Sequence, residues 1–160
     1  MDTSRKLQAS RIIDAPADQI FEVLADPNRH TDLDGADMLR GMAAESPPIV
    51  GIGQSFTMNM HQPDLGDYRI VNRITAFVPG SRIGWEPHID PTSDLADKLG
   101  DMDAAGHTYT YDLREVDGGT EVTQTYEWMS VKDPDFAAFF PRVSQDQLQA
   151  SLDKLADAVR

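Results

Sequence analysis

The chain has 160 residues, of which 40% are hydrophobic and 8% aromatic, which is enough for one globular domain with its own core. Its 27 acidic and 14 basic residues give a formal net charge of -13, which disfavours nucleic acid and anionic membranes as partners by repulsion. Cysteine is absent, so disulfides, thiolate nucleophiles and cysteine-bound metals are excluded.

Neither a membrane span nor an export signal is visible in the sequence. No apolar run approaches ~20 residues, and the N-terminal segment MDTSRKLQAS has no apolar signal core. We therefore expect a cytoplasmic protein with no membrane insertion, no nucleic-acid partner and a single domain over residues 1–160.

The N-terminal part predicts one strand followed by two short helices. Residues 7–13 form the strand, and Asp14 can cap a helix that has Pro16 in its first turn. Pro27 ends that helix, because proline disfavours helical backbone in the residue before it. Residues 28–34 are expected to form the second short helix.

The middle of the chain predicts antiparallel strands joined by turns. Residues 38–42 could be helical or a loop, and the pattern leaves both open. Apolar and polar side chains alternate over residues 55–60 and 68–75, and again around residues 83–85, with turns rich in proline and glycine between them. We expect a short helix in the long insertion at residues 88–106, and loops of this length are usually functional or mobile.

The clearest strand pattern is the hairpin that runs from His107 to Trp128. Two runs of strict alternation, rich in Thr, Tyr and Val, flank Asp117-Gly118-Gly119, and these glycines supply the positive φ values of a tight turn. One face of both strands is aromatic and has to be covered.

The last segment predicts the element that covers this face. Ser144 is a good helix cap, and Leu148, Leu152, Leu155 and Val159 follow it in one stripe of about four turns. We therefore predict an α+β helix-grip fold: a curved antiparallel sheet of about six strands wrapped around a long C-terminal helix, with two short helices after the first strand.

This order of elements resembles the START/Bet v 1-like (SRPBCC) superfamily, and within it the polyketide cyclase/dehydrase-like branch. The stretches that carry the resemblance are DAPADQIFEVLADPNRHTDLDG, GIGQSF, RITAFVPGSRIGWEP and DGGTEVTQTYEW, together with the terminal helix. They cover nearly the whole chain, with one departure at Leu33, where relatives often carry Trp. The resemblance implies an internal cavity for an apolar small molecule, in a family with cyclases, carriers and ligand sensors.

Strand parity, with the phenylalanines before the last helix, predicts which side chains line such a pocket. They are Phe56, Met58, Met60, Ile70, Asn72, Ile74, Trp85, Tyr109, Tyr111, Gln124, Tyr126, Trp128, Phe136, Phe140 and Leu148. The same residues could instead form a filled core. Asn72 and Gln124 need hydrogen-bond partners on this apolar face, and either tyrosine hydroxyls or a ligand could supply them.

Three histidines fall at one end of the predicted sheet. His61, His88 and His107 could together bind a divalent metal, but His61 has outward parity, so solvated histidines at the rim are the preferred interpretation. We expect no metal and no cofactor.

Three classes of function are compatible with this sequence. The leading hypothesis is binding of an apolar or aromatic, lipid- or polyketide-like molecule by a monomer or homodimer. The alternative is a cyclase or dehydratase, for which His107, Tyr109, Tyr111 and Tyr126 are the candidate acids and bases. A third is a protein-interaction module that uses the same groove.

Overall fold

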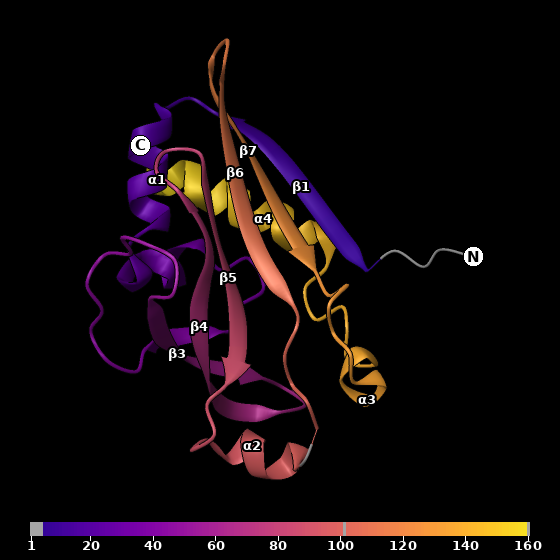
Figure 1. Ribbon diagram of the computed structural model, residues 1–160. Helices are drawn as coiled ribbons and strands as arrows, with labels where there is room; N and C mark the ends of the chain where they lie inside the picture. The colour runs from indigo at the N-terminus through magenta and orange to yellow at the C-terminus, as the bar shows by residue number, and fades with distance from the viewer. Residues whose placement is uncertain (1–4, 101, 160) are drawn as a thin grey trace.

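The computed structural model describes residues 5–100 and 102–159, and in these residues seven antiparallel strands form one sheet in the order β1-β7-β6-β5-β4-β3-β2 (Figure 1). The strands are β1 (Lys6–Ile13), β2 (Leu39–Met42), β3 (Ser55–Gln62), β4 (Gly66–Val78), β5 (Arg82–Ile89), β6 (Thr108–Val116) and β7 (Gly119–Glu127). The predicted meander is confirmed, and the first strand returns to pair with the last.

Residues 38–42 were predicted to be helical or a loop, and both alternatives are wrong, because Leu39–Met42 forms β2. This strand makes seven strands instead of about six in the described residues. It is a four-residue edge strand, and its pairing with β3 shifts register between Leu39 and Met42. Gly41 within it has a φ of 108°, which side chains other than glycine rarely adopt. A strand this short and irregular carries no alternation pattern, so only its pairing with β3 defines it.

The helices lie largely where the sequence predicts them. They are α1 (Ala17–Leu24), the 3-10 helix η1 (Pro27–Leu33), α2 (Asp94–Leu99), α3 (Pro134–Ala137) and α4 (Gln145–Ala158). One detail of the prediction is wrong: Asp14 does not cap α1, whose cap is Pro16, without a side-chain hydrogen bond. The chain bends before that helix, and Ala15 N donates to Ile13 O at 2.9 Å instead.

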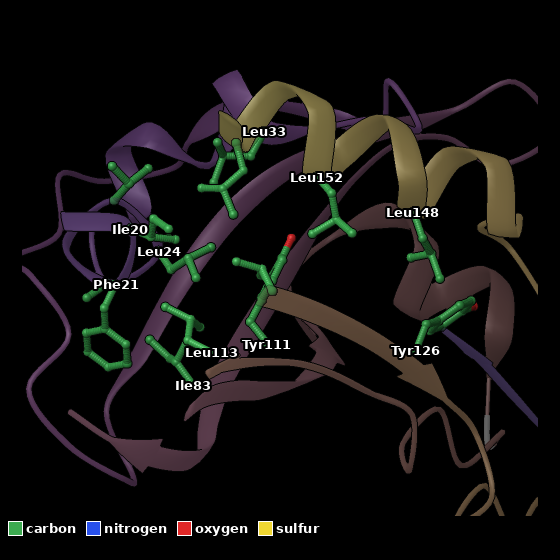
Figure 2. Packing of buried hydrophobic residues seen from close by; sticks show 14 of the residues in the cluster. Ile20, Phe21, Leu24, Leu33, Ile83, Tyr111, Leu113, Tyr126, Leu148 and Leu152 are labelled. Carbon is green, nitrogen blue, oxygen red and sulfur yellow. The ribbon is translucent and has the colours of Figure 1, made fainter. Parts of the chain in front are cut away.

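The C-terminal helix α4 begins at a complete capping box. Gln147 N donates to Ser144 Oγ at 3.1 Å, and Ser144 N donates to Gln147 Oε1 at 2.8 Å. From there α4 crosses one face of the sheet, and Figure 2 shows Leu148 and Leu152 pointing down from it toward the strands. Leu148, Leu152 and Leu155 are 1% exposed or less, which confirms the predicted stripe.

The helices α1 and η1 pack on the same side, beside the C-terminal part of α4. Their apolar side chains join one buried cluster with the sheet and α4, in which Ile20 and Leu24 are fully buried. Figure 2 shows this aliphatic group gathered near Ile83 and Leu113. No helix within the described residues is both long and apolar enough to cross a membrane.

Candidate functional site: a cavity between the sheet and the C-terminal helix

Next to the aliphatic cluster, a cavity of about 180 Å³ lies between the sheet and helix α4. Its walls come from the sheet, from η1, from α2 and from the loop that leads into α4. The lining residues are His30, Leu33, Asp34, Ala36, Met38, Leu39, Phe56, Met58, Met60, Gln62, Leu65, Tyr68, Ile70, Asn72, Trp85, Pro87, Ile89, Leu95, Leu99, His107, Tyr109, Tyr111, Gln124, Tyr126, Phe136, Phe139, Phe140, Arg142, Val143, Leu148 and Ser151. All four tyrosines of the chain are among them.

The lining predicted from strand parity matches this cavity with two exceptions, Ile74 and Trp128. Ile74 is fully buried in the aliphatic cluster, where the β4–β5 register shifts directly after it. Trp128 follows the end of β7 and stacks on Phe140, with ring centroids 5.9 Å apart. The prediction that both tryptophans face the pocket is therefore correct for Trp85 and wrong for Trp128.

The insertion at residues 88–106 closes one end of the cavity. It holds α2, as its apolar residues predicted, and α2 packs against β4 at the lower end of the sheet in Figure 1. Leu95 and Leu99 of this helix line the cavity, and Leu95 is 3% exposed. The insertion is therefore part of the site.

The tyrosines of the hairpin form an aromatic wall. The rings of Tyr109 and Tyr126 stack with centroids 4.7 Å apart and planes within 3°. The hydroxyl oxygen of Tyr126 accepts a hydrogen bond from Arg142 N at 3.1 Å. Burial raises the pKa of Tyr126 to about 12 and also raises the pKa values of Tyr109 and Tyr111 well above their ordinary value. These phenols therefore stay protonated at neutral pH and act as hydrogen-bonding groups.

Two glutamines line the cavity, and they differ in their hydrogen bonding. Gln62 is satisfied: its Nε2 donates to the Tyr68 hydroxyl at 2.6 Å, and its Oε1 accepts from Arg142 Nη1 at 3.4 Å. Gln124 is 5% exposed, and its Oε1 is buried without a hydrogen-bond partner among the described residues. An unpartnered amide oxygen in a buried site is unfavourable, so this atom is a candidate contact for a bound molecule.

His30 is a cavity residue that the sequence analysis did not identify. Its Nε2 donates to Leu24 O at 2.8 Å, and its ring stacks on Trp85 with centroids 5.0 Å apart. Burial lowers the pKa of His30, so the ring is neutral near pH 7. The missed signal was the spacing of Pro27, His30 and Leu33, because positions i and i+3 share one face of a 3-10 helix.

The three histidines considered for a metal site do not converge. His61 Nδ1 contacts Asp67 Oδ1 at 2.7 Å and His88 Nε2 contacts Glu86 Oε1 at 2.8 Å, so both are bound to acidic neighbours. His107 instead lines the cavity and packs on Phe140 with centroids 4.8 Å apart. No group of three or more potential metal ligands occurs in residues 5–100 and 102–159.

His107 is held in an apolar environment at the start of β6. Its Nδ1 is buried without a partner among the described residues. Burial, with a smaller contribution from nearby His88, lowers its pKa to about 4. The imidazole is therefore neutral at pH 7, and a group with this pKa is a weak base and is rarely protonated there.

Arg142 also lines the cavity and was not identified from the sequence. Its Nη1 contacts Asp64 Oδ2 at 2.8 Å, which joins the loop before α4 to the turn between β3 and β4. Its guanidinium lies over the ring of Phe139 at 5.0 Å. It is the single lysine or arginine among the lining residues, and Asp64 already neutralises it.

A carboxylate also faces the cavity from the residue after η1. Asp34 accepts hydrogen bonds from three backbone N–H groups, those of Ala36 at 3.0 Å, Met38 at 2.6 Å and Leu39 at 2.7 Å. These donors fix the chain that leads into β2. Asp34 therefore has a local structural role and adds negative charge to this side of the cavity.

The family model for "Polyketide cyclase / dehydrase and lipid transport" matches residues 4–160. The chain belongs to this family. The predicted resemblance is thereby confirmed for the family and the fold. The family description names two kinds of activity, conversion of polyketides and transport of lipids, and both involve largely apolar small molecules.

Among curated proteins, this chain is similar to two uncharacterized proteins of Mycobacterium tuberculosis. One, from strain H37Rv, is 29% identical over 115 residues, which are 71% of this chain and 43% of that protein. The other, from strain CDC 1551, is 35% identical over 103 residues, which are 58% of this chain and 45% of that protein. The matches therefore span less than half the length of these relatives.

Several solved structures share the fold. A Mycobacterium smegmatis protein has a TM-score of 0.67 at 17% identity, covering 98% of this chain and 91% of its own. An Arthrobacter aurescens protein has a TM-score of 0.69 at 13% identity, and the match covers 98% of this chain and 86% of that protein. The Aha1 dimer from Colwellia psychrerythraea has a TM-score of 0.58 at 15% identity, and the match covers 96% of this chain and 95% of that chain. These likenesses support the helix-grip fold.

Proposed function

We propose that this protein binds an apolar or aromatic small molecule, lipid- or polyketide-like, in the cavity between the sheet and α4. The observation that carries the proposal is the unfilled volume of about 180 Å³ in an otherwise closely packed interface. Aromatic and aliphatic side chains form most of its wall, with a few polar groups between them, which is the usual composition of a ligand pocket. The family description supports the same class of ligand.

The volume of the cavity limits the size of the molecule that it can bind. A dry protein cavity of ~150 Å³ accommodates benzene, so about 180 Å³ suits one aromatic ring or one ring-sized part of a larger molecule. Complete drug-sized ligands occupy sites of ~300–1,000 Å³. A larger molecule would therefore place only part of itself in this volume.

The test is a calorimetric titration with toluene, compared between the wild type and a cavity-filling variant. Ile70→Phe adds volume to a cavity wall and is expected to weaken binding at least about tenfold. Val122→Ile is the control, because it adds one methylene in the aliphatic cluster away from the cavity, and it should leave the affinity within about twofold. Equal affinity in Ile70→Phe and wild type would refute binding in this cavity.

Catalysis by the same cavity has less support. A cyclase or dehydratase needs a group that transfers a proton near neutral pH. Burial lowers the pKa of His107 to about 4 and raises the pKa values of Tyr109, Tyr111 and Tyr126 well above their ordinary value, so none of the predicted acids and bases is poised for that step. We therefore propose binding as the function and keep enzyme activity as an outcome to be tested.

A further inference from the structure

We propose that the bound molecule carries a neutral hydroxyl group, and that this hydroxyl donates its hydrogen to Gln124 Oε1. This inference rests on the proposed binding function and adds to it a chemical class: phenols and alcohols, in preference to hydrocarbons and to ionised carboxylic acids. It follows from the hydrogen-bonding state of the cavity wall.

The first step is that Gln124 Oε1 is an acceptor without a donor. The side chain is 5% exposed, lines the cavity and has no partner for this oxygen among the described residues. Its cross-strand neighbour is Tyr111, whose hydroxyl oxygen accepts a hydrogen bond from the side-chain amide of Gln124. Tyr109, two residues before Tyr111 in β6, donates its hydroxyl hydrogen to Tyr126. Neither contact gives Gln124 Oε1 a donor.

His30, which lines the same cavity, carries a second acceptor atom. Its Nε2 must carry the ring proton, because the atom that it contacts is the carbonyl oxygen of Leu24. The ring is neutral, so Nδ1 keeps its lone pair. A ligand hydroxyl can supply the donor that Gln124 Oε1 lacks, whereas ethers, ketones and hydrocarbons have no such donor.

The charged groups of the cavity wall favour a neutral ligand. The carboxylate of Asp34 lies in the cavity wall, and the tyrosines and both cavity histidines are neutral near pH 7. Arg142 is the single lysine or arginine in the lining, and Asp64 is 2.8 Å from it. An anionic head group would face unpartnered acceptors without a free counter-ion, so a neutral hydroxyl is favoured over a carboxylate.

Phenol, toluene and benzoate are suitable probes, because each contains one ring and phenol and toluene have nearly the same shape. Calorimetry gives the dissociation constants of toluene and phenol. In the ratio of the toluene constant to the phenol constant, the contribution of the ring to the binding free energy cancels. In Gln124→Leu the ratio should fall about tenfold relative to the wild type, since the phenol loses its acceptor. Benzoate should bind the wild type at least about tenfold more weakly than phenol.

The control is Val122→Ile, which changes the aliphatic cluster away from the cavity. It leaves every polar group of the cavity wall in place, so the ratio should stay within about twofold of the wild-type value. An unchanged ratio in Gln124→Leu, or tight binding of benzoate, would overturn the inference while leaving the proposed binding function intact. Failure of all three probes to bind the wild type would instead count against binding itself.

A measurement on the wild-type protein covers the case in which Gln124→Leu does not fold. The side-chain carbonyl carbon of Gln124, observed by ¹³C NMR, should shift when phenol is added and shift far less with toluene, because its oxygen then accepts a hydrogen bond. The Gln62 carbonyl is the internal reference. Equal responses of the Gln124 signal to phenol and toluene would contradict the proposed contact.

Discussion

The two halves of the interface between α4 and the sheet are built from the same alternating pattern, yet one half is filled and the other is hollow. Toward the C-terminal half of the helix, Leu152 and Leu155 join Ile83 and Val122 in a cluster in which all four are fully buried. Branched aliphatic side chains can interdigitate to the density of an organic crystal, so no usable space remains there.

Toward the N-terminal half of α4, Leu148 and Ser151 face a wall of tyrosines, amides and histidines, and the cavity lies between them. Flat rings and hydrogen-bonded amides hold fixed orientations, and they cannot rearrange to fill the remaining space. The difference indicates that the aliphatic half supplies stability, whereas the aromatic half is less closely packed and leaves the volume of the proposed binding site.

The largest expected effect tests the filled half. Leu152→Ala should lower the free energy of unfolding by about 2–5 kcal/mol, because it removes a fully buried side chain and leaves a void. Leu148→Ala is the matched variant on the cavity side, and it should lie nearer ~2 kcal/mol, since it enlarges a space that already exists. Denaturant unfolding measures both. A loss below about 0.5 kcal/mol for Leu152→Ala would be typical of a surface site and would contradict the packing.

The next effect tests the burial of His107 through the pH dependence of stability. Unfolded His107 takes up a proton near pH 6.5, whereas the folded form stays neutral down to about 4. The unfolded state therefore binds more protons between these values, and the free energy of unfolding falls as the pH is lowered from 6.5 to 4. The contribution is on the order of 2 kcal/mol.

The variant His107→Gln separates this contribution from that of the other titrating groups. Its free energy of unfolding should fall less between pH 7 and pH 4.5 than that of the wild type, and denaturant titrations at both pH values measure the difference. Identical losses in the two proteins would show that His107 is not buried. The same variant should leave any turnover of a polyketide-like substrate unchanged, because a group with a pKa of about 4 does not serve as a base at neutral pH.

The third effect compares the two cavity glutamines in the protein without ligand. Gln62→Leu should destabilise the fold by about 1–3 kcal/mol, because Tyr68 and Arg142 lose a partner. Gln124→Leu should cost less, because its Oε1 has no partner to lose and only Tyr111 loses a contact. Thermal unfolding of the two variants side by side reveals the order, and the reverse order would show that Gln124 is satisfied inside the protein.

The smallest effect is spectroscopic and follows from the unequal placement of the tryptophans. Binding of an aromatic ligand should change the emission of Trp85, which lines the cavity, far more than that of Trp128, which does not. Trp128→Phe should therefore keep the saturable fluorescence response, and Trp85→Phe should lose most of it. A response that survives only in Trp85→Phe would place the ligand outside this cavity.

Much of the fold was predictable from the sequence because its signals are local. Alternation in the hairpin, the turn at Asp117-Gly118-Gly119 and the capping box at Ser144 each depend on neighbouring residues. Strand parity also predicted about two thirds of the cavity wall that the sheet contributes, because successive side chains of a strand point to opposite faces. The lining residues of the strands that it missed are Leu39, Gln62, Tyr68, Pro87 and Ile89.

The tertiary structure decided what no local pattern contains. Whether the inward face is filled or hollow depends on the shapes of side chains that meet from distant elements, so the cavity and the exclusion of Trp128 emerge only on packing. His30 and Arg142 reach the site from a 3-10 helix and a loop, where side-chain direction has no simple period. The isolation of Gln124 Oε1 was equally invisible in the sequence, because an unpartnered atom is defined by which groups fail to reach it in space.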